Sequence, residues 1–290
     1  MKKILIIGRE GQLGSTFHEQ TQKLSWADFS YTTVDTLNLM DSTAIHSFFK
    51  DKNFDYLINC AAYTAVDRAE TEPADAWRLN SEAPKELAGE ASRMNAGFIH
   101  ISTDYVFGGE HSRPLKPETP QTPDSVYGKS KLQGELNVLQ QQPESIIIRT
   151  SWLYSRYGRN FLKTMLQLGK ERDTLNVVFD QVGTPTLADD LADAILTILK
   201  NIIAKEKEFT PGVYHFSNEG VCSWFDFTKA IFYESGISCK VIPVESDQFP
   251  TPAARPAYSV MDKSKIKNTF GIEIEHWQDS LRKCLKNMNS

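Results

Sequence analysis

The stretch ILIIGREGQLG, residues 4–14, decides the fold of this chain. Four apolar residues followed at once by glycine are typical of a buried parallel strand that enters a tight turn. Glycines in such a turn let the backbone approach a pyrophosphate at the N-terminus of the next helix. Gly8, Gly11 and Gly14 have the spacing G-x-x-G-x-x-G, a variant of the G-x-G-x-x-G fingerprint. We therefore predict a dinucleotide-binding βα unit, with an ordinary glycine-rich turn as the alternative.

The next predicted strand, residues 29–34, is followed by Asp35, roughly 20 residues beyond the glycines. An acidic residue at this point binds the ribose hydroxyls of NAD and disfavours the 2′-phosphate of NADP. Arg9, inside the glycine loop, attracts that phosphate instead. Because the two side chains favour different cofactors, the sequence leaves both NADPH and NADH open.

Strand-like and helix-like segments alternate through the first half of the chain, which predicts a parallel sheet with helices on both faces. The predicted strands are 2–7, 29–34, 55–60, 98–102 and 145–150. The predicted helices begin near residues 12, 42, 73, 84 and 125, and the last ends near 141. We expect Asp124 to cap this last helix. The stretch 108–124, rich in Pro, Gly, Thr and Glu, is expected to form a long surface loop.

Beyond residue 150 the pattern changes, which predicts a second, smaller α/β domain. The helices predicted beyond this point are 160–171, 188–203, 223–236 and 277–287, and the predicted strands are 176–179, 213–216 and 240–244. The fold class is therefore α/β, a Rossmann doubly wound sheet with a second domain. We assign 1–150 and about 176–211 to the dinucleotide domain, and 151–175 and about 212–290 to the substrate domain.

Composition narrows the class of protein further. The net charge of −5 over 290 residues gives no basic footprint for nucleic acid. Apolar runs are far shorter than the ~18–20 residues of a membrane-spanning helix, and the run near the N-terminus is too short for a signal peptide. The four cysteines (Cys60, Cys222, Cys239, Cys284) form no C-x-x-C pair. This favours a reduced, cytoplasmic protein without a metal site.

Tyr127 and Lys131 lie four residues apart in the predicted helix 125–141, so both lie on one helical face. The pKa of a free tyrosine is about 10, and a nearby ammonium lowers it. Thr103, at the end of the predicted strand 98–102, can aim a hydroxyl at the same substrate oxygen. The three residues predict a proton-transfer device for a carbonyl/alcohol pair, with a surface Tyr–Lys pair as the alternative.

Eight blocks of sequence carry a family resemblance that extends over nearly the whole chain. They are GREGQLG (8–14), INCAAYTAVDRAE (58–70), ISTDYVFGG (101–109), YGKSK (127–131), RTSWLY (149–154), GRNF (158–161), DQVGTPT (180–186) and RPAYSVMDKSK (255–265). In this order they resemble the dTDP-4-dehydrorhamnose reductase family of the extended short-chain dehydrogenase/reductase superfamily. The resemblance implies that NAD(P)H reduces the C4 ketone of dTDP-4-dehydro-L-rhamnose to give dTDP-L-rhamnose.

The same resemblance implies roles for individual residues. Catalysis would involve Thr103, Tyr127 and Lys131, with Tyr127 and Lys131 also touching the cofactor. The other residues expected at the cofactor are Gly8, Gly11, Gln12, Leu13, Gly14, Asp35, Asn38, Leu39, Ala62, Tyr63 and Thr64. The residues expected at the sugar nucleotide are Thr103, Asp104, Tyr105, Tyr127, Trp152, Asn160, Gln181 and Arg255.

Two departures from related sequences matter. Some family members dimerise through metal-binding glutamates, one of them near the start of the first helix, where this chain has Ser15, Thr16 and Phe17. A monomer is therefore favoured over a magnesium-bridged dimer. Sugar-nucleotide 4,6-dehydratases carry an acidic pair after the threonine, where this chain has Asp104 and Tyr105, so simple reduction is favoured. The alternatives are a reductase or epimerase for another deoxysugar nucleotide and a non-catalytic regulatory subunit of the methionine adenosyltransferase type.

Overall fold

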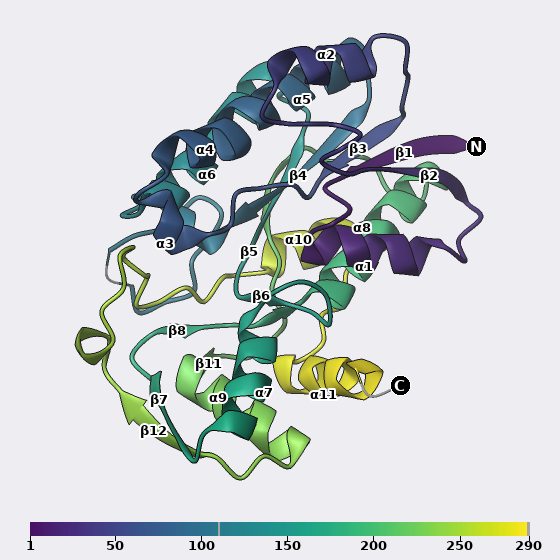
Figure 1. Ribbon diagram of the computed structural model, residues 1–290. Helices are drawn as coiled ribbons and strands as arrows, with labels where there is room; N and C mark the ends of the chain where they lie inside the picture. The colour runs from purple at the N-terminus through teal and green to yellow at the C-terminus, as the bar shows by residue number, and fades with distance from the viewer. Residues whose placement is uncertain (110, 289–290) are drawn as a thin grey trace.

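The computed structural model describes residues 1–109 and 111–288, so Glu110 in the predicted loop 108–124 lies outside the described residues. Its upper part is built on a six-stranded sheet (Figure 1). The strands are β1 (Lys2–Ile7), β2 (Ala27–Thr32), β3 (Tyr56–Asn59), β4 (Gly97–Thr103), β5 (Ile146–Thr150) and β10 (Gly212–His215). Their order is β10-β5-β4-β3-β1-β2, and every neighbouring pair is parallel.

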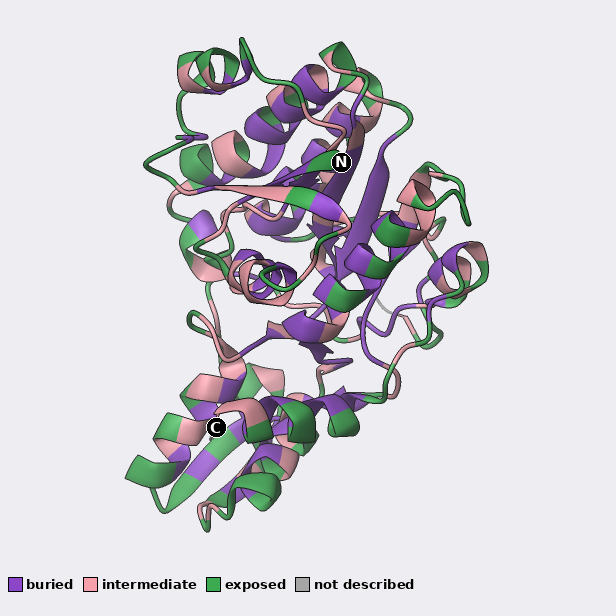
Figure 2. Cartoon of the chain, turned by 90° about the vertical axis from the view of Figure 1, so that its right-hand side faces the viewer, coloured by how far each residue is buried: buried purple, intermediate pink, exposed green. Residues whose placement is uncertain are grey.

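Helices cover both faces of this sheet because the strands are apolar on both sides. Ile4 and Ile6 of β1 face α1 (Gln12–Thr21) and α8 (Ala188–Ile203) in one core cluster. Leu5 and Ile7 face the opposite cluster. The opposite layer contains α2 (Ser42–Phe49), α5 (Ala83–Arg93) and α6 (Val126–Gln141). Figure 2 shows the result, with buried strands in the middle and exposed outer helix faces. The expected Rossmann-type α/β fold is confirmed.

The lower part of the molecule has its own apolar core, made largely by three helices (Figure 1). The helices are α7 (Phe161–Glu171), α9 (Trp224–Ser235) and α11 (Trp277–Met288). The short paired strands are β6 (Leu153–Tyr154) with β9 (Thr186–Leu187), β7 (Thr174–Val178) with β12 (Lys240–Val244), and β8 (Val182–Gly183) with β11 (Cys222–Ser223). The remaining elements are α3 (Val66–Ala69), α4 (Pro73–Trp77), the π-helical η1 (Arg78–Glu82), the 3₁₀ turns η2 (Asp104–Val106) and η3 (Ser246–Gln248), and α10 (Ser264–Phe270).

Three segments lie in a different part of the molecule from the one that we expected. β10 joins the central sheet beside β5, and α10 contacts it, although both fall within the range 212–290 assigned to the substrate domain. β7, which covers most of 176–179, pairs with β12 in the lower part instead of returning to the central sheet. Strand pairing joins residues far apart in the chain, so local periodicity does not reveal it. The division into two domains stays a prediction.

The sheet order places a ligand site at one particular point. The connection that leaves β1 leads to β2 on one side, and the connection that leaves β3 leads to β4 on the other side, so the two run in opposite directions. In open α/β sheets, ligands bind outside the carboxyl ends of the strands at such a switch point. The glycine loop follows β1 at this edge, and the Thr103 segment follows β4 at the same edge.

Candidate active site

The glycine loop is packed too tightly for side chains. Gly8 has φ +91°, and a Cβ there would lie 2.9 Å from the backbone nitrogen of Ala61. A Cβ on Gly14 would lie 2.1 Å from the Gly8 carbonyl oxygen, so the first turn of α1 sits directly on the loop. Gly11 is the N-cap of α1 and donates its N–H to the Gly8 carbonyl at 3.1 Å. Such a bare backbone at a helix N-terminus is the cradle that a pyrophosphate needs.

The loops after β2 and β3 supply the other residues expected at the cofactor. β2 ends at Thr32, so Asp35 lies in an exposed turn beyond it rather than directly at its end. Asn38 is also exposed, whereas the Leu39 side chain is buried in the core. The backbone N–H of Arg9 binds the Thr32 carbonyl at 2.9 Å, which brings Arg9 to the edge where Asp35 lies. After β3, the segment 62–64 follows with Ala62 and Tyr63 half-buried and Thr64 exposed.

A buried asparagine that sequence reasoning missed holds this last segment. The Asn80 side chain accepts from the Tyr63 N–H at 2.9 Å and donates to the Tyr63 carbonyl at 3.1 Å. The same amide donates to the Ser130 hydroxyl of α6 at 3.0 Å. Asn80 lies in the π-helical turn η1, and such turns often occur at functional sites. A lone asparagine inside a helical pattern carries no sequence signal that predicts this role.

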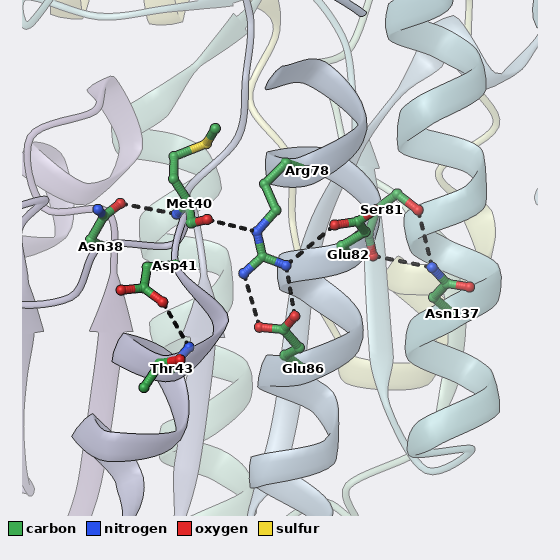
Figure 3. A network of polar contacts seen from close by, with 9 residues as sticks. All are labelled: Asn38, Met40, Asp41, Thr43, Arg78, Ser81, Glu82, Glu86 and Asn137. Carbon is green, nitrogen blue, oxygen red and sulfur yellow. Dashed lines mark hydrogen bonds and ion pairs between the residues drawn. The ribbon is translucent and has the colours of Figure 1, made fainter. Parts of the chain in front are cut away.

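Figure 3 shows how the same π-helical segment fixes the loop that carries Asn38. The guanidinium of Arg78 binds Glu86 through two contacts of 2.6 and 3.0 Å and donates from Nε to the Met40 carbonyl at 3.2 Å. The Met40 N–H in turn donates to the Asn38 side chain at 3.0 Å. Asn137 of α6 donates to the Ser81 hydroxyl at 3.0 Å. These contacts couple the loop 38–41 to α6 through η1.

Helix α6 presents the Tyr-x-x-x-Lys pair. Ser125, rather than the expected Asp124, caps it, because the Ser125 hydroxyl accepts the Gly128 N–H at 3.1 Å. Tyr127 is 8% exposed and Lys131 is 2% exposed, so the alternative of a surface pair is wrong. The Lys131 ammonium donates to the Ile101 carbonyl of β4 at 2.7 Å.

Burial dominates the electrostatics of this pair. It raises the pKa of Tyr127 above its usual range, while an interaction with the Thr103 side chain lowers it and the nearby Asp104 carboxyl raises it. The expected lowering of the Tyr127 pKa is therefore wrong for this structure, and at neutral pH the phenol keeps its proton. Burial lowers the pKa of Lys131 to about 8, with the Glu135 carboxylate opposing the shift. A protonated tyrosine is what a proton donor to a developing alkoxide requires.

Thr103, Asp104 and Tyr105 meet Tyr127 at the end of β4. The Thr103 hydroxyl donates to Asp104 Oδ1 at 3.0 Å and accepts the Tyr105 N–H at 3.3 Å. The ring of Tyr105 lies edge-on to that of Tyr127, with centroids 5.3 Å apart. Asp104 is 2% exposed, and burial raises the pKa of its carboxyl to about 6 against the opposing effects of Ser259 and Thr103. The structure thus brings four of the predicted residues into one cluster.

Arg255 reaches this cluster from the C-terminal part of the chain. It forms a 2.7 Å ion pair with Asp67, and its interaction with Tyr105 lowers the pKa of that phenol, which burial raises to about 12. Its Nη1 is buried without a hydrogen-bond partner among the described residues. Such a group can take up an anionic ligand without losing an existing hydrogen bond at that nitrogen.

Trp152 lies just past β5 in an unusual backbone conformation, with φ +48°. A positive φ on so bulky a residue is strained and marks functional positions. Its ring stacks on Trp224 with centroids 3.5 Å apart and also lies close to Gly183. Trp152 therefore connects the edge of the central sheet to the lower core.

The remaining predicted residues are not part of this cluster. The Asn160 side chain caps α7 by accepting the Lys163 N–H and donates to Gln12 Oε1 at 2.9 Å. Gln12 also accepts from the Ser155 hydroxyl at 3.0 Å, so its side chain faces the 153–160 segment and only its backbone faces the loop. Gln181 donates to the Ser246 hydroxyl at 3.0 Å. Leu13 is a core residue at 4% exposure.

No group of three or more His, Cys, Asp or Glu side chains in residues 1–109 and 111–288 is arranged to hold a metal ion. Within the same residues, every helix is too short or too polar to span a bilayer.

The doubly wound sheet, the bare glycine turn and the buried Thr–Tyr–Lys set are typical of a dinucleotide-dependent oxidoreductase. The model of one family, described as RmlD substrate binding domain, matches residues 1–290. A dTDP-4-dehydrorhamnose reductase from Sinorhizobium fredii is 39% identical over 289 residues, which cover 98% of this chain and 96% of the relative.

Solved structures agree with this match over the full length. A dTDP-4-dehydrorhamnose reductase from Clostridium acetobutylicum superposes with a TM-score of 0.94 at 40% identity, covering 99% of this chain and 100% of the other. The Bacillus anthracis enzyme of the same name, solved in complex with NADP, gives a TM-score of 0.91 at 35% identity with the same coverage. The chain belongs to the RmlD substrate binding domain family.

Proposed function

We propose that this protein reduces the C4 ketone of dTDP-4-dehydro-L-rhamnose to give dTDP-L-rhamnose, the last step of dTDP-rhamnose biosynthesis, with NADPH or NADH as the reductant. The observation that carries the proposal is the buried cluster of Thr103, Tyr127 and Lys131 at the sheet edge. This cluster occurs in a chain that matches proteins named dTDP-4-dehydrorhamnose reductase along nearly its whole length. A transfer of hydride and proton to a ketone uses these residue types in this arrangement.

The residues of the sheet edge fit a dinucleotide. The glycine loop would hold the pyrophosphate, the 35–39 segment the adenosine, and the 62–64 segment together with Lys131 the nicotinamide ribose. The fit rests on the Gly8 and Gly14 backbone, which leaves no room for a Cβ. When bound, the reduced nicotinamide supplies the hydride. The protein's own part is to orient the ketone and deliver the proton.

Tyr127 is the proton donor in this mechanism. Burial keeps the phenol protonated at neutral pH, so its hydrogen is available to the C4 oxygen as negative charge develops there. Once cofactor and ketone are bound, the positive charge of the Lys131 ammonium would favour the loss of the proton from Tyr127. The Thr103 hydroxyl, which lies against Tyr127, would stabilise the alkoxide by a hydrogen bond.

The sugar nucleotide would lie between the β4 edge and the lower core. Asp104, Tyr105 and Trp152 would contact the sugar, and Arg255, with its unpartnered Nη1, would bind the diphosphate. Asn160 and Gln181 are proposed at the nucleotide end, where their side chains also bind Gln12 and Ser246. We further propose that the protein acts in the cytoplasm as a monomer and does not bind nucleic acid.

The test is oxidation of NADPH and of NADH, followed by absorbance, with enzymatically prepared dTDP-4-dehydro-L-rhamnose. Other 4-keto sugar nucleotides serve as comparison substrates for the same protein preparation. Rapid oxidation with the rhamnose precursor and slow oxidation with the others supports the proposal. A folded protein that reduces another sugar nucleotide faster, or none at all, contradicts it.

A further inference from the structure

The Gln12 side chain joins the glycine loop to the segment 153–160, which lies 141–148 residues further along the chain. Its Oε1 accepts a hydrogen from the Asn160 side-chain amide at 2.9 Å and the Ser155 hydroxyl hydrogen at 3.0 Å. Its Nε2 donates to the Leu153 carbonyl at 3.4 Å. Gln12 is also the first residue of α1, so its backbone belongs to the proposed pyrophosphate cradle while its side chain binds a different part of the molecule.

The segment 153–160 is packed closely against α1. Gly158 has φ +60°, which a glycine adopts without strain, and a Cβ there would lie 3.2 Å from Gln12 Cγ. The Asn160 side chain also caps α7, so its contact with Gln12 connects two helix N-termini. Glu19 lies seven residues after Gln12 on the same face of α1 and accepts the Tyr157 hydroxyl hydrogen at 2.6 Å.

The same contacts lead directly to Trp152, the proposed sugar contact. Leu153, whose carbonyl Gln12 contacts, is the next residue after Trp152. Trp152 has φ +48°, a conformation that persists only when the surrounding structure fixes it. Its carbonyl accepts the Thr186 N–H at 3.2 Å, and its ring stacks on Trp224. One hydrogen bond and one peptide link therefore separate the Gln12 side chain from Trp152.

We infer that Gln12 is a positioning residue that couples the binding of the dinucleotide to the binding of the sugar nucleotide. A dinucleotide on the glycine loop fixes Gln12, and Gln12 in turn holds the segment 152–160 in the orientation that the sugar nucleotide requires. This inference rests on the proposed function. Ordering a segment costs conformational entropy, so a ligand that binds after the segment is ordered loses less of it. By linkage, each ligand then tightens the binding of the other by the same factor.

The experiment measures, by calorimetry, the Kd of dTDP-L-rhamnose with and without saturating NADPH, and the Kd of NADPH with and without dTDP-L-rhamnose. Both compounds are in the reduced state, so their complex does not react. The ratio of the Kd without the other ligand to the Kd with it is the coupling factor. For the wild type we expect a factor of at least about five, the lower end of the usual range, and the same factor in both directions.

Gln12→Met is the test variant. Methionine keeps the length of the side chain and a similar helix propensity, but it offers no amide oxygen to Asn160 and Ser155. The coupling factor should fall to about one in both directions. A merely structural role of Gln12 would change the stability or the individual Kd values and leave this factor as it is in the wild type.

Gln20→Ala provides the matched control. Gln20 lies on the same helix, and its amide donates to the Asp189 carbonyl of α8 at 3.0 Å, a contact with the other helix of that sheet face. Its coupling factor should equal that of the wild type. If Gln12→Met does not fold, Ser155→Ala removes a donor to Gln12 from the other side and should also lower the factor.

The outcomes separate the inference from the proposed function. A wild type in which the two ligands bind independently overturns the coupling. A factor that stays at the wild-type value in Gln12→Met, or that falls equally in Gln20→Ala, overturns the role of Gln12 alone. A folded protein that binds NADPH but not dTDP-L-rhamnose overturns the proposed substrate, and the inference with it.

Discussion

Gly134→Ala should impair catalysis although the residue carries no functional group. Gly134 lies on α6, where a Cβ would be 2.0 Å from the Asn80 carbonyl oxygen in the π-helical turn. Real Cβ contacts are not shorter than 3.0 Å, so the two backbones must separate by about 1 Å, the difference between these distances. The same helix carries Tyr127, and a misplacement of this size costs a factor on the order of 10² in rate.

The assay compares kcat, cofactor Kd and urea unfolding for Gly134→Ala and the wild type. We expect kcat to fall on the order of 10²-fold and the free energy of unfolding to fall by about 1–3 kcal/mol, the usual cost of overpacking. The control is Gly89→Ala in α5, where the nearest atom is a Gln141 side-chain oxygen at 3.8 Å. This variant should gain about 0.5–1 kcal/mol from helix propensity and keep its kcat. Wild-type kcat and stability in Gly134→Ala would refute the reasoning.

Three further predictions concern variants that remove one charged side chain. Asp104→Asn should unfold at higher urea concentration than the wild type, because a carboxyl whose pKa rises from 3.8 to about 6 costs up to about 3 kcal/mol when ionised. That gain is complete above about pH 6 and lost as the pH falls toward 4, and an equal gain at both pH values would contradict it. Arg9→Ala should raise the KM for NADPH and leave the KM for NADH unchanged. Asp35→Ala should lower the KM for NADPH relative to that for NADH. If neither variant changes the ratio of the two KM values, neither residue determines the cofactor preference. Lys131→Ala should weaken cofactor binding and lower kcat, measured by titration and by steady-state rates, and if neither changes the pairing with Tyr127 is wrong.

Local sequence patterns predicted many elements well because periodicity and capping residues lie within the element itself. The amphipathic pattern at 188–203 matches α8 residue for residue. Ser223 and Asp226 form the capping box of α9, and Gly236 ends that helix with φ +66°, which a glycine adopts without strain. The glycine loop was predicted from three glycines, and two of them, Gly8 and Gly14, are packed too tightly for a Cβ.

The features that were missed depend on contacts between distant parts of the chain. The strand signal of Gly212–His215 is local, but its place beside β5 is decided by the crossover through α8. The short helix Ser264–Phe270 was not expected, because seven residues give too little periodicity. Ser259 reaches Asp104 from the far end of the sequence, and no spacing rule connects the two.

The predicted direction of the Tyr127 pKa shift was wrong because it too depends on the folded structure. The sequence shows that Lys131 lies one helical turn from Tyr127, but it does not show how deeply the phenol is buried. In the folded chain burial is the largest effect on this pKa, and the Lys131 ammonium binds the Ile101 carbonyl. The resulting protonated phenol suits the reduction better than the lowered pKa that we expected.

The most direct test of the central claim is the single-turnover rate of dTDP-4-dehydro-L-rhamnose reduction by Tyr127→Phe at saturating NADPH, with cofactor Kd measured on the same preparation. The account predicts a rate lower by a factor on the order of 10²–10⁴, the usual contribution of a positioned proton donor, and a nearly unchanged Kd. A Tyr127→Phe protein that turns over at the wild-type rate would contradict it.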